Sequence, residues 1–423
     1  MTLYWLFAPF LAALAFGGCR EESRVVQRPE KVVSLREVIY DNETYTRLDS
    51  LWSRYHEAYP SEDAYANWMY AARYAGDPEY PSLLEAGVRR YPSNPRLLYL
   101  RSMVHHGRPN DLEALTLLER AVELDPSYTD PWFSLVIHYF ERGEREKANF
   151  ALRKLLEAGA IQEEVMDFSY NMLAGLEPNA VIVTNGDNDT YPVWILTRVA
   201  RFREDVRLVN MSLLNTDWYA LTLPAEGLPS LISAEGMDSL KSEYVRRLTA
   251  ARTDPSRQPG PFSDELVRRL VRACTEAGRP VYFAATCQPS ESLRGLKAGG
   301  RELGLATLVS PQGKSEADQV RRITDVWLKE FRTAGIDSWR MRYAPGSNAG
   351  KILVQNYGTA MQSQMDRFAR HAPDQRLPLF RWYRDHLRPV LAGRERESLD
   401  RTWCRTSEIG EIKEWCRKTI LLN

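Results

Sequence analysis

Two different spacings of apolar residues divide the chain near residue 178. Before that point, apolar positions recur at the spacing of amphipathic helices, and prolines stand at the joints between successive runs. After Glu177 and Pro178, short runs of β-branched residues alternate with helical stretches. The pattern predicts a helical part followed by an α/β part.

The helical part repeats with a period of 34 residues. One unit, counted from Thr129, has the residue types of a tetratricopeptide repeat at Trp132, Leu135, Tyr139, Gly143, Ala148, Leu152 and Leu155. Earlier units match at Leu98, Ala114, Leu118, Ala121 and Pro126 and, more loosely, at Ala64, Trp68, Ala71, Leu84 and Pro92. Because one two-helix unit cannot bury its apolar face alone, such units stack.

We therefore predict a tetratricopeptide-like helical solenoid over residues 61–175. A linker and helical lead-in are expected before it, over residues 20–60. Stacks of this kind usually present a surface to another protein. We expect a protein partner on the repeat surface, an inference from architecture rather than from a site.

Four strands are predicted in the second half, over residues 180–184, 206–210, 280–286 and 305–310. Helices are predicted over residues 191–202, 263–277 and 316–340, with Ser263 as the cap of the second helix. Strands that alternate with helices favour a parallel sheet covered on both faces. The expected fold class is α plus α/β: a solenoid, then a parallel-sheet α/β domain over residues 178–345 and a helical tail over residues 346–423.

Polar residues gather where two of the predicted strands end. NGDND follows the first strand and MSLLNTDWY follows the second, and open α/β sheets bind ligands beyond the carboxyl ends of their strands. Carboxylates and amides beside a tryptophan suit the hydroxyl groups and ring faces of sugars. The candidate ligand-binding residues are Asn185, Asp187, Asn188, Asp189 and Thr190 in the first stretch, and Asn215, Asp217 and Trp218 in the second.

The same residues have purely structural explanations, which the sequence leaves open. Gly186 and its polar neighbours are typical of a tight turn. Asp189 or Thr190 would cap the helix that follows. Trp218 and Tyr219 could anchor their loop in the core.

Metal binding and catalysis are further alternatives. Asp187 and Asp189 could hold a divalent cation, with oxygens added by Asn185, Thr190 and Asp217. The two carboxylates could also act as acid and base, although residues two apart in a turn rarely straddle a substrate. Segment 178–345 contains no histidine, so a Ser-His-Asp triad is poorly supported. We name no catalytic residue, predict no cofactor and leave the metal open.

The block from Thr184 to Tyr219 resembles a known family. It reads TNGDNDTYP, then DVR, then NMSLLNTDWY. These motifs resemble the soluble C-terminal part of a bacterial membrane family that is protein-O-mannosyltransferase-like and otherwise of unknown function. PVYFAAT and GLATLVSP fit the same family, so the resemblance covers about residues 178–340. The family's membrane-embedded part has no counterpart here, and glycosyl transfer is therefore not implied.

The N-terminus has an apolar segment that ends in a cysteine. MTLYWLFAPFLAALAFGG holds about eighteen uncharged, mostly apolar residues before Cys19, with small residues just before the cysteine. This ending resembles a bacterial lipobox, which implies a signal peptide over residues 1–19 and a lipid on Cys19. An uncleaved membrane anchor and ordinary secretion are the alternatives.

The charge balance bears on nucleic-acid binding, and the cysteine positions bear on disulfide formation. With 56 basic and 56 acidic residues, the chain gives no general case for binding nucleic acid. In an exported protein cysteines can pair, and Cys404 and Cys416 are close enough in sequence to form a disulfide. For Cys274 and Cys287, two buried thiols are favoured.

These observations predict an exported protein, lipid-anchored through Cys19 at a bacterial membrane, on the periplasmic or surface face of the outer membrane. We expect it to bind and scaffold in the cell envelope. The solenoid would hold a protein partner, and the α/β module would hold a polar ligand such as a glycan. The alternative is an enzyme that acts on glycans or lipid-linked sugars through the loop of Asp187 and Asp189.

Overall fold

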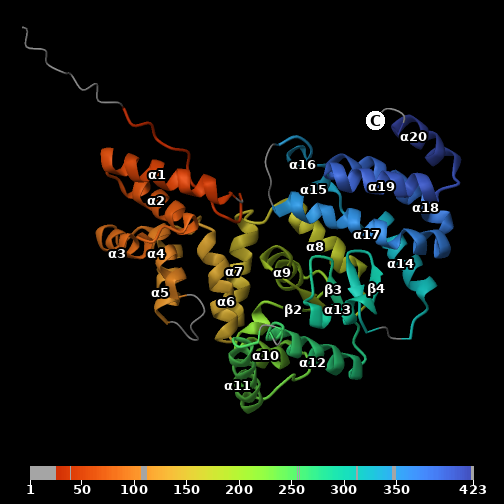
Figure 1. Cartoon of the computed structure of the whole chain (residues 1–423), viewed down its shortest axis with the longest axis horizontal. Coiled ribbons are helices and arrows are strands. Elements are labelled where there is room, and N and C mark those ends of the chain that lie inside the picture. Colours follow the sequence, from red (N-terminus) through yellow and green to blue (C-terminus); the bar gives the residue numbers. More distant parts are fainter. Residues whose placement is uncertain are drawn as a thin grey trace, which may run out of the picture.

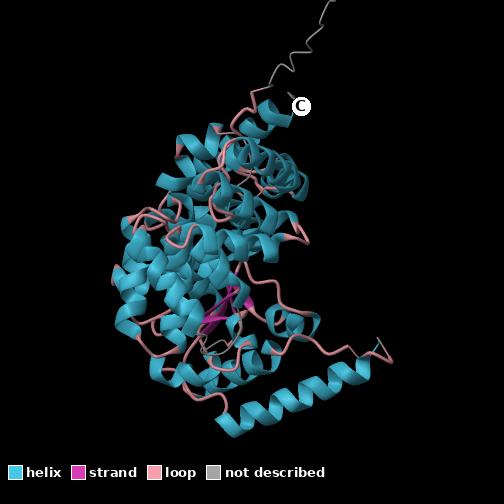
Figure 2. Cartoon of the chain, turned by 90° about the vertical axis from the view of Figure 1, so that its left-hand side faces the viewer, coloured by secondary structure: helices cyan, strands magenta, loops and turns pink. Residues whose placement is uncertain are grey.

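The computed structural model describes residues 25–38, 40–105, 112–254, 256, 258–310, 313–344 and 349–420. This part is mostly helical, with one five-stranded sheet near the middle of the molecule (Figure 1). Helices surround the sheet (Figure 2), and the C-terminal helices lie at the end opposite α1–α5 (Figure 1). The predicted lipidation site, Cys19, lies outside the described residues.

The N-terminal part is a series of helices in which, from α1 to α7, each packs against the next. They are α1 (Asn42–Ala58), α2 (Glu62–Ala75), α3 (Tyr80–Arg90), α4 (Pro95–Ser102), α5 (Leu112–Leu124), α6 (Asp130–Glu141), α7 (Arg145–Glu157) and α8 (Glu163–Gly175). Helices α2, α4, α6 and α8 begin at residues 62, 95, 130 and 163. Their assignment to the tetratricopeptide family stays a prediction.

Small residues let these helices approach one another closely. Ala64 of α2 and Ala148 of α7 are fully buried. Gly87 of α3 lies so near Tyr65 that a Cβ there would meet a ring atom at 2.3 Å. A larger residue at position 87 would push α3 away from α2.

Polar side chains fix where the helices begin. Ser61 accepts a hydrogen bond from the backbone N–H of Ala64 at the start of α2, and Asn94 accepts one from Leu97 at the start of α4. Pro95 occupies the first position of α4, where its missing N–H costs no hydrogen bond.

The second part is built around a sheet with the strand order β2-β1-β3-β5-β4. The strands are β1 (Val181–Thr184), β2 (Arg207–Asn210), β3 (Val281–Ala284), β4 (Arg301–Leu303) and β5 (Ala306–Leu308). β1 lies parallel to both β2 and β3. Every residue of β1 and β3 is buried, as in strands covered on both faces.

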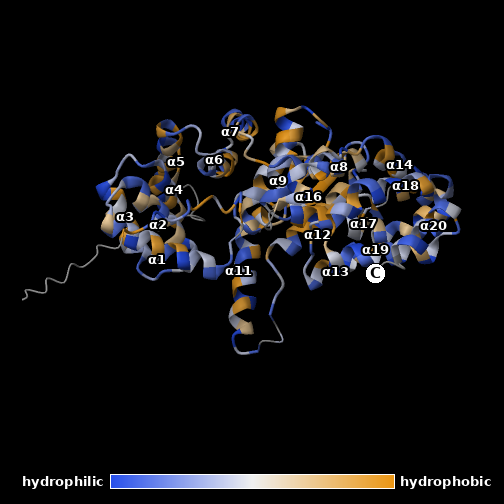
Figure 3. Cartoon of the chain, turned by 90° about the horizontal axis from the view of Figure 1, so that it is seen from above, coloured by the Kyte–Doolittle hydropathy of each residue, from blue (hydrophilic) through white to orange (hydrophobic). Residues whose placement is uncertain are grey.

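The remaining helices cover the sheet and form the tail. They are α9 (Asp187–Trp194), α10 (Tyr219–Thr222), α11 (Ala234–Ala251), α12 (Ser263–Glu276), α13 (Glu291–Ala298), α14 (Glu316–Lys329), α15 (Ala334–Asp337), α16 (Trp339–Tyr343), α17 (Ala349–His371), α18 (Arg376–Trp382), α19 (Gly393–Thr406) and α20 (Gly410–Ile420). α9 continues into a π-helical turn, Ile195–Val199. α11 projects away from the rest of the molecule (Figure 3).

The prediction of an all-parallel sheet is wrong at one edge. β5 runs antiparallel to both β3 and β4. Leu303 pairs with Ala306, so only Gly304 and Leu305 connect β4 to β5. A parallel pair needs a crossover of a dozen or more residues, whereas two residues permit only a hairpin.

Two of the predicted helices differ in detail. The single helix predicted over residues 316–340 is three helices, interrupted at residues 330–333 and at Ser338, and Gly335 of α15 lies against α8. A Cβ on Gly335 would lie 2.4 Å from the Cα of Glu164, so the chain passes directly over that helix. The predicted cap Ser263 is instead the first residue of α12, and its N–H donates to Asn215 Oδ1 at 3.0 Å.

The tail packs back on α8 and α14. Tyr357 of α17 stacks edge-to-face on Phe168 of α8, with ring centroids 5.5 Å apart, and accepts a hydrogen bond from Asn171. A disulfide joins Cys404 of α19 to Cys416 of α20. In the described part of the chain, no helix combines the length and apolar character needed to cross a membrane.

Helix α9 joins the two hydrophobic cores. Tyr191, Trp194 and Ile195 belong to the hydrophobic core of the N-terminal helices, whereas Val193 and Leu196 belong to the core around the sheet. The Tyr191 hydroxyl also donates to the backbone carbonyl of a residue in α6, at 2.8 Å. The two parts therefore meet across α9, next to the strand ends where the sequence predicts a ligand.

Candidate functional site

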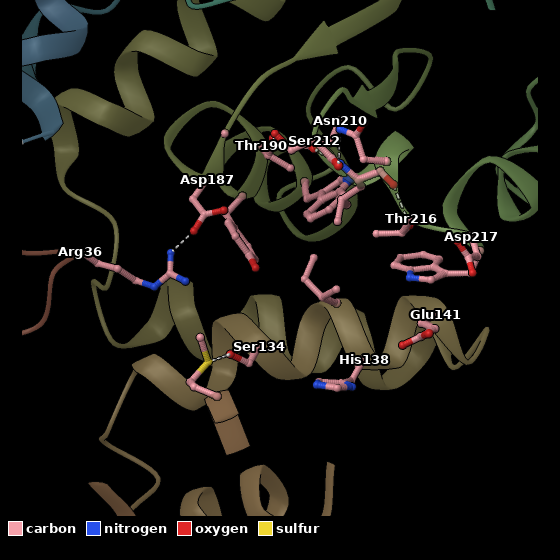
Figure 4. Close-up of a pocket in the computed structure, with 18 residues that line it drawn as sticks. Arg36, Ser134, His138, Glu141, Asp187, Thr190, Asn210, Ser212, Thr216 and Asp217 are labelled. Atoms are coloured by element: carbon pink, nitrogen blue, oxygen red, sulfur yellow. Dashed lines mark hydrogen bonds and ion pairs between the residues drawn. The ribbon is translucent and has the colours of Figure 1, made fainter. Parts of the chain in front are cut away.

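A cavity of about 690 Å³ lies between α6 and the loops after β1 and β2 (Figure 4). Its volume is that of a small-molecule site, for which roughly 300–1,000 Å³ is usual. We call it the cleft. It is lined by Arg36; by Met103, Ser134, Ile137, His138 and Glu141; by Gly186, Asp187, Thr190, Tyr191 and Trp194; and by Asn210, Ser212, Leu213, Asn215, Thr216, Asp217 and Trp218.

One wall of the cleft is a face of α6. Ser134, Ile137, His138 and Glu141 are three or four residues apart, so they share one side of the helix. Figure 4 shows Ser134, His138 and Glu141 along this side, across from the loops of the α/β part. The α/β segment contains no histidine, and the helical part supplies one to the same cavity.

A buried polar network forms the opposite wall. Asn210 Nδ2 donates to Thr190 Oγ1 at 2.7 Å, and Thr190 Oγ1 lies 2.8 Å from Thr184 Oγ1. Asn210 Oδ1 accepts the N–H of Leu213 at 2.8 Å. Thr190 thus reaches the cleft, as predicted for a ligand residue, but its hydroxyl already ties the end of β1 to the end of β2.

Asp187 lines the cleft and is paired with Arg36. The Arg36 Nη1 to Asp187 Oδ2 distance is 2.5 Å, and 57% of the Asp187 side chain is exposed. The guanidinium of Arg36 also lies 4.0 Å from the ring centroid of Phe133 and 5.7 Å from that of Tyr191. This end of the cleft therefore presents an ion pair, drawn in Figure 4, whose guanidinium lies against aromatic rings.

Asp189 has turned back onto the chain and does not line the cleft. Its carboxylate is buried and accepts the N–H groups of Asn185 and Gly186, at 3.0 and 2.9 Å, and the hydroxyl of Thr286. Burial raises the pKa of the Asp189 carboxyl, while the hydroxyl and the N–H donors oppose this. The structure thus gives Asp189 the turn-and-cap role.

The hydrogen bond between Thr286 and Asp189 lies where open α/β sheets usually bind a ligand. The chain leaves β1 toward β2 on one side and returns to β3 on the other, which makes the β1/β3 edge the topological switch point. There the Asp189 carboxylate accepts from Thr286, just after β3. The cleft lies beside this point, toward β2, where the chain instead meets α6.

Two other predicted residues lie outside the cleft. The side chain of Asn185 is exposed, and its carbonyl accepts a hydrogen bond from Ser212 Oγ at 2.7 Å. Asn188 lines a separate cavity of only about 20 Å³, beside Arg36 and Asp187. That cavity holds little more than one water molecule, roughly 10–15 Å³ on this measure.

The three residues predicted in the second loop all line the cleft. Asn215 caps α12 through its side-chain oxygen. Asp217 forms an ion pair with Lys241 of α11. Trp218 packs edge-to-face against Tyr219, with centroids 5.4 Å apart, and remains partly exposed. Trp218 therefore both anchors its loop and offers an aromatic surface.

The residues that the helical part contributes to the cleft were not predicted from the sequence. Ser134, His138 and Glu141 have helical spacing, which would have shown that they share a face. Nothing in the sequence indicated that this face meets the strand ends. Arg36 is 151 residues from Asp187, and no motif links them.

The cleft offers hydrogen bonding and aromatic contact. Among the described residues, no group of three His, Cys, Asp or Glu side chains is placed to hold a metal ion. The lining contributes hydroxyls, amides, carboxylates, an imidazole and the rings of Tyr191, Trp194 and Trp218. Such a surface binds a polar molecule that has an apolar face.

One protein-family model matches the part of the chain that forms the strand-end side of the cleft. The model of the TMEM260-associated domain 2 matches residues 165–246. The matched segment runs from α8 into α11 and includes β1, α9, β2 and both strand-end loops. The match is consistent with the resemblance to the protein-O-mannosyltransferase-like family. No curated protein matches the chain.

Proposed function

We propose that the protein binds a polar, sugar-like ligand in the cleft. The observation that carries the proposal is that one cavity of about 690 Å³ joins a partly exposed Trp218 to carboxylates, amides and hydroxyls from both parts of the chain. The faces of sugar rings pack on aromatic rings, and their hydroxyls pair with carboxylates and amides. The aromatic contacts that fix α9 to α6 would keep this arrangement rigid before the ligand arrives.

The charges of the cleft favour an uncharged or amino-bearing ligand. Glu141, Asp187 and Asp217 bring three carboxylates to the lining; Arg36 pairs with Asp187, and Lys241 of α11 pairs with Asp217. A ligand that carries a carboxylate or phosphate would have to compete with these carboxylates for the two cations. We therefore favour a neutral or amino-substituted glycan over an acidic one.

Calorimetric titration of neutral, amino-bearing and carboxylate-bearing oligosaccharides tests this proposal. Trp218→Ala should weaken binding of the best ligand at least about tenfold, equivalent to 1.4 kcal/mol, because the aromatic contact is lost. Trp339→Ala is the matched control, since Trp339 is 73% exposed and does not line the cleft. Equal affinity of the wild type and Trp218→Ala would contradict the proposal.

We also propose that the chain is exported, lipid-anchored at Cys19 and engaged by a protein partner on its helical hairpins. The lipobox-like sequence supports the first two points. The disulfide between Cys404 and Cys416 supports export, because disulfides persist in oxidising compartments. Metabolic labelling with palmitate, compared in the wild type and Cys19→Ser, tests the anchor; equal labelling would refute it.

A second candidate is an enzyme that cleaves a glycan in the same cleft. The observation in its favour is that carboxylates line the cleft from both sides, with Glu141 on α6 and Asp217 on the opposite loop. The pair of Asp187 and Asp189 does not support it, because Asp189 faces away. New reducing ends formed by the wild type but not by Glu141→Gln would establish this activity; no reducing ends would dismiss it.

A further inference from the structure

The segment just before α1 lies across three helices of the N-terminal part, α2, α4 and α6. We call residues 30–38 the strap, and the sides of α2, α4 and α6 that contact it the strap face. Residues 30–34 form neither helix nor strand. Val32 and Ser34 are buried while Lys31 is exposed, as in an extended chain lying on a surface. From Leu35 the chain turns, and the Ser34 carbonyl accepts the N–H groups of Glu37 and Val38.

Side chains of the strap face bind the backbone of the strap. Asn67 Oδ1 accepts the N–H of Val32 at 3.0 Å, and Arg96 donates to the carbonyl of the same residue. Tyr70 Oη accepts the N–H of Leu35 at 3.1 Å. These contacts involve only backbone groups of the strap, so they would hold another chain that has the same backbone path and direction.

Two contacts depend on the side chains of the strap. Ser34 Oγ donates to Asp130 Oδ1 at 2.6 Å, and Asp130 is only 1% exposed. Tyr70 and Tyr128 donate to the other oxygen of that carboxylate, at 3.3 and 3.2 Å. A buried carboxylate needs such donors, so the Ser34 hydroxyl completes a site that the hairpins leave incomplete.

The second side-chain contact is made by Arg36. It stacks on Phe133 of α6 and pairs with Asp187, so the end of the strap forms one end of the cleft. A strap that leaves its face would remove this guanidinium from the cleft and leave the Asp187 carboxylate without it.

We propose that the strap face is a binding surface for a peptide that is extended up to a hydroxyl residue, turns there and carries an arginine two positions later, and that the strap is its resident occupant. A partner of this kind binds by displacing the strap. Because the strap is tethered to its own binding surface, its effective concentration there is on the order of millimolar. A free peptide at micromolar concentration therefore displaces the strap from the strap face only when the strap binds more weakly. This inference is separate from the ligand of the cleft, and its test uses no glycan.

The test weakens the strap in the full chain and leaves the strap face intact. Ser34→Asp places a second carboxylate against buried Asp130, and we expect it to release the strap. Leu35→Asp adds the same charge one residue later, where the side chain is 38% exposed, and should leave the strap in place. Tryptic cleavage after Lys31 and Arg36 should be at least about tenfold faster in Ser34→Asp alone.

Binding in trans is measured with a fluorescent synthetic peptide, RPEKVVSLREV, of residues 28–38. We expect it to bind Ser34→Asp at least about tenfold more tightly than the wild type or Leu35→Asp. A peptide with aspartate in place of the serine should not bind. Unchanged cleavage in Ser34→Asp, or faster cleavage without peptide binding, would overturn the proposal. If Ser34→Asp does not fold, Ser34→Ala removes the hydrogen bond without adding charge, and the same two outcomes apply to it.

Discussion

Asp187 and Asp189 are two positions apart, yet their carboxylates differ in exposure and in partners. Asp187 is more than half exposed and pairs with Arg36 at one end of the cleft. Asp189 is buried and accepts two backbone N–H groups and a hydroxyl. The first residue belongs to the ligand site that we propose, and the second belongs to the turn that positions it.

Because of this difference, replacing each aspartate with alanine should lower the free energy of unfolding by a different amount. Asp189→Ala removes a buried carboxylate from three partly buried donors and should lower the free energy of unfolding by about 2–3 kcal/mol, because a donor left without a partner costs roughly 1–3 kcal/mol when water does not reach it. Asp187→Ala breaks an exposed ion pair and should cost no more than about 1 kcal/mol. Urea unfolding followed by circular dichroism measures both values. Equal costs in the two variants would show that the turn does not depend on Asp189.

The sequence was informative about which residues are polar and near one another, but not about which way each side chain points. Asp187, Thr190, Asn215, Asp217 and Trp218 line the cleft, and their role in binding a ligand stays a prediction. Asp189 does not line it, because the turn offers backbone donors to a nearby carboxylate, and Asp189 bonds to them rather than to solvent. Choosing between these two outcomes requires the burial that only the folded chain shows.

At the scale of elements, the hairpin of β4 and β5 depends on one glycine. Gly304 has a φ of +63°, and a Cβ there would lie 2.7 Å from the Ile323 side chain of α14. Its N–H donates to Gln364 Oε1 at 2.8 Å, so the turn is also held from α17. The position therefore needs a residue without a side chain on two separate grounds.

Gly304→Ala should lower the free energy of unfolding by about 2–4 kcal/mol, since it adds overpacking of roughly 1–3 kcal/mol to the strain of a left-handed residue. Gly278→Ala is the matched control. Gly278 has a similar φ of +67° but no neighbour within 4 Å of an added Cβ, so about 1–2 kcal/mol is expected. Thermal unfolding compares the two; an equal loss would mean that the contact with Ile323 carries no energy.

Strands and helices were predictable where apolar runs are long enough to be read. β1, β2, β3 and β5 fall within the predicted strand ranges, because each range is a short apolar run that includes β-branched or aromatic residues. β4 was missed because it has three residues, two of them charged, Arg301 and Glu302. Its pairing with β5 depends on the two-residue turn, which periodicity does not reveal.

At the scale of the whole molecule, the cleft exists because α9 packs on α6. Tyr191 contacts Phe133 and Trp194 contacts Phe140, with ring centroids 4.8 and 4.9 Å apart. These contacts bring residues of the hairpins to the strand ends of the α/β part. The sequence predicted both parts separately, but their relative placement depends on contacts between residues far apart in the chain, which no local pattern encodes.

Our main proposal is that both parts of the chain form one ligand site. It is tested by calorimetric titration of the best oligosaccharide into Ser134→Phe, because a phenyl ring would project into the cleft from α6 and leave the strand-end loops unaltered. We predict an affinity at least about tenfold below that of the wild type, a loss of 1.4 kcal/mol or more. Unchanged affinity, in a variant with a native circular dichroism spectrum, would mean that the ligand does not occupy the space between α6 and the loops, and would contradict the claim.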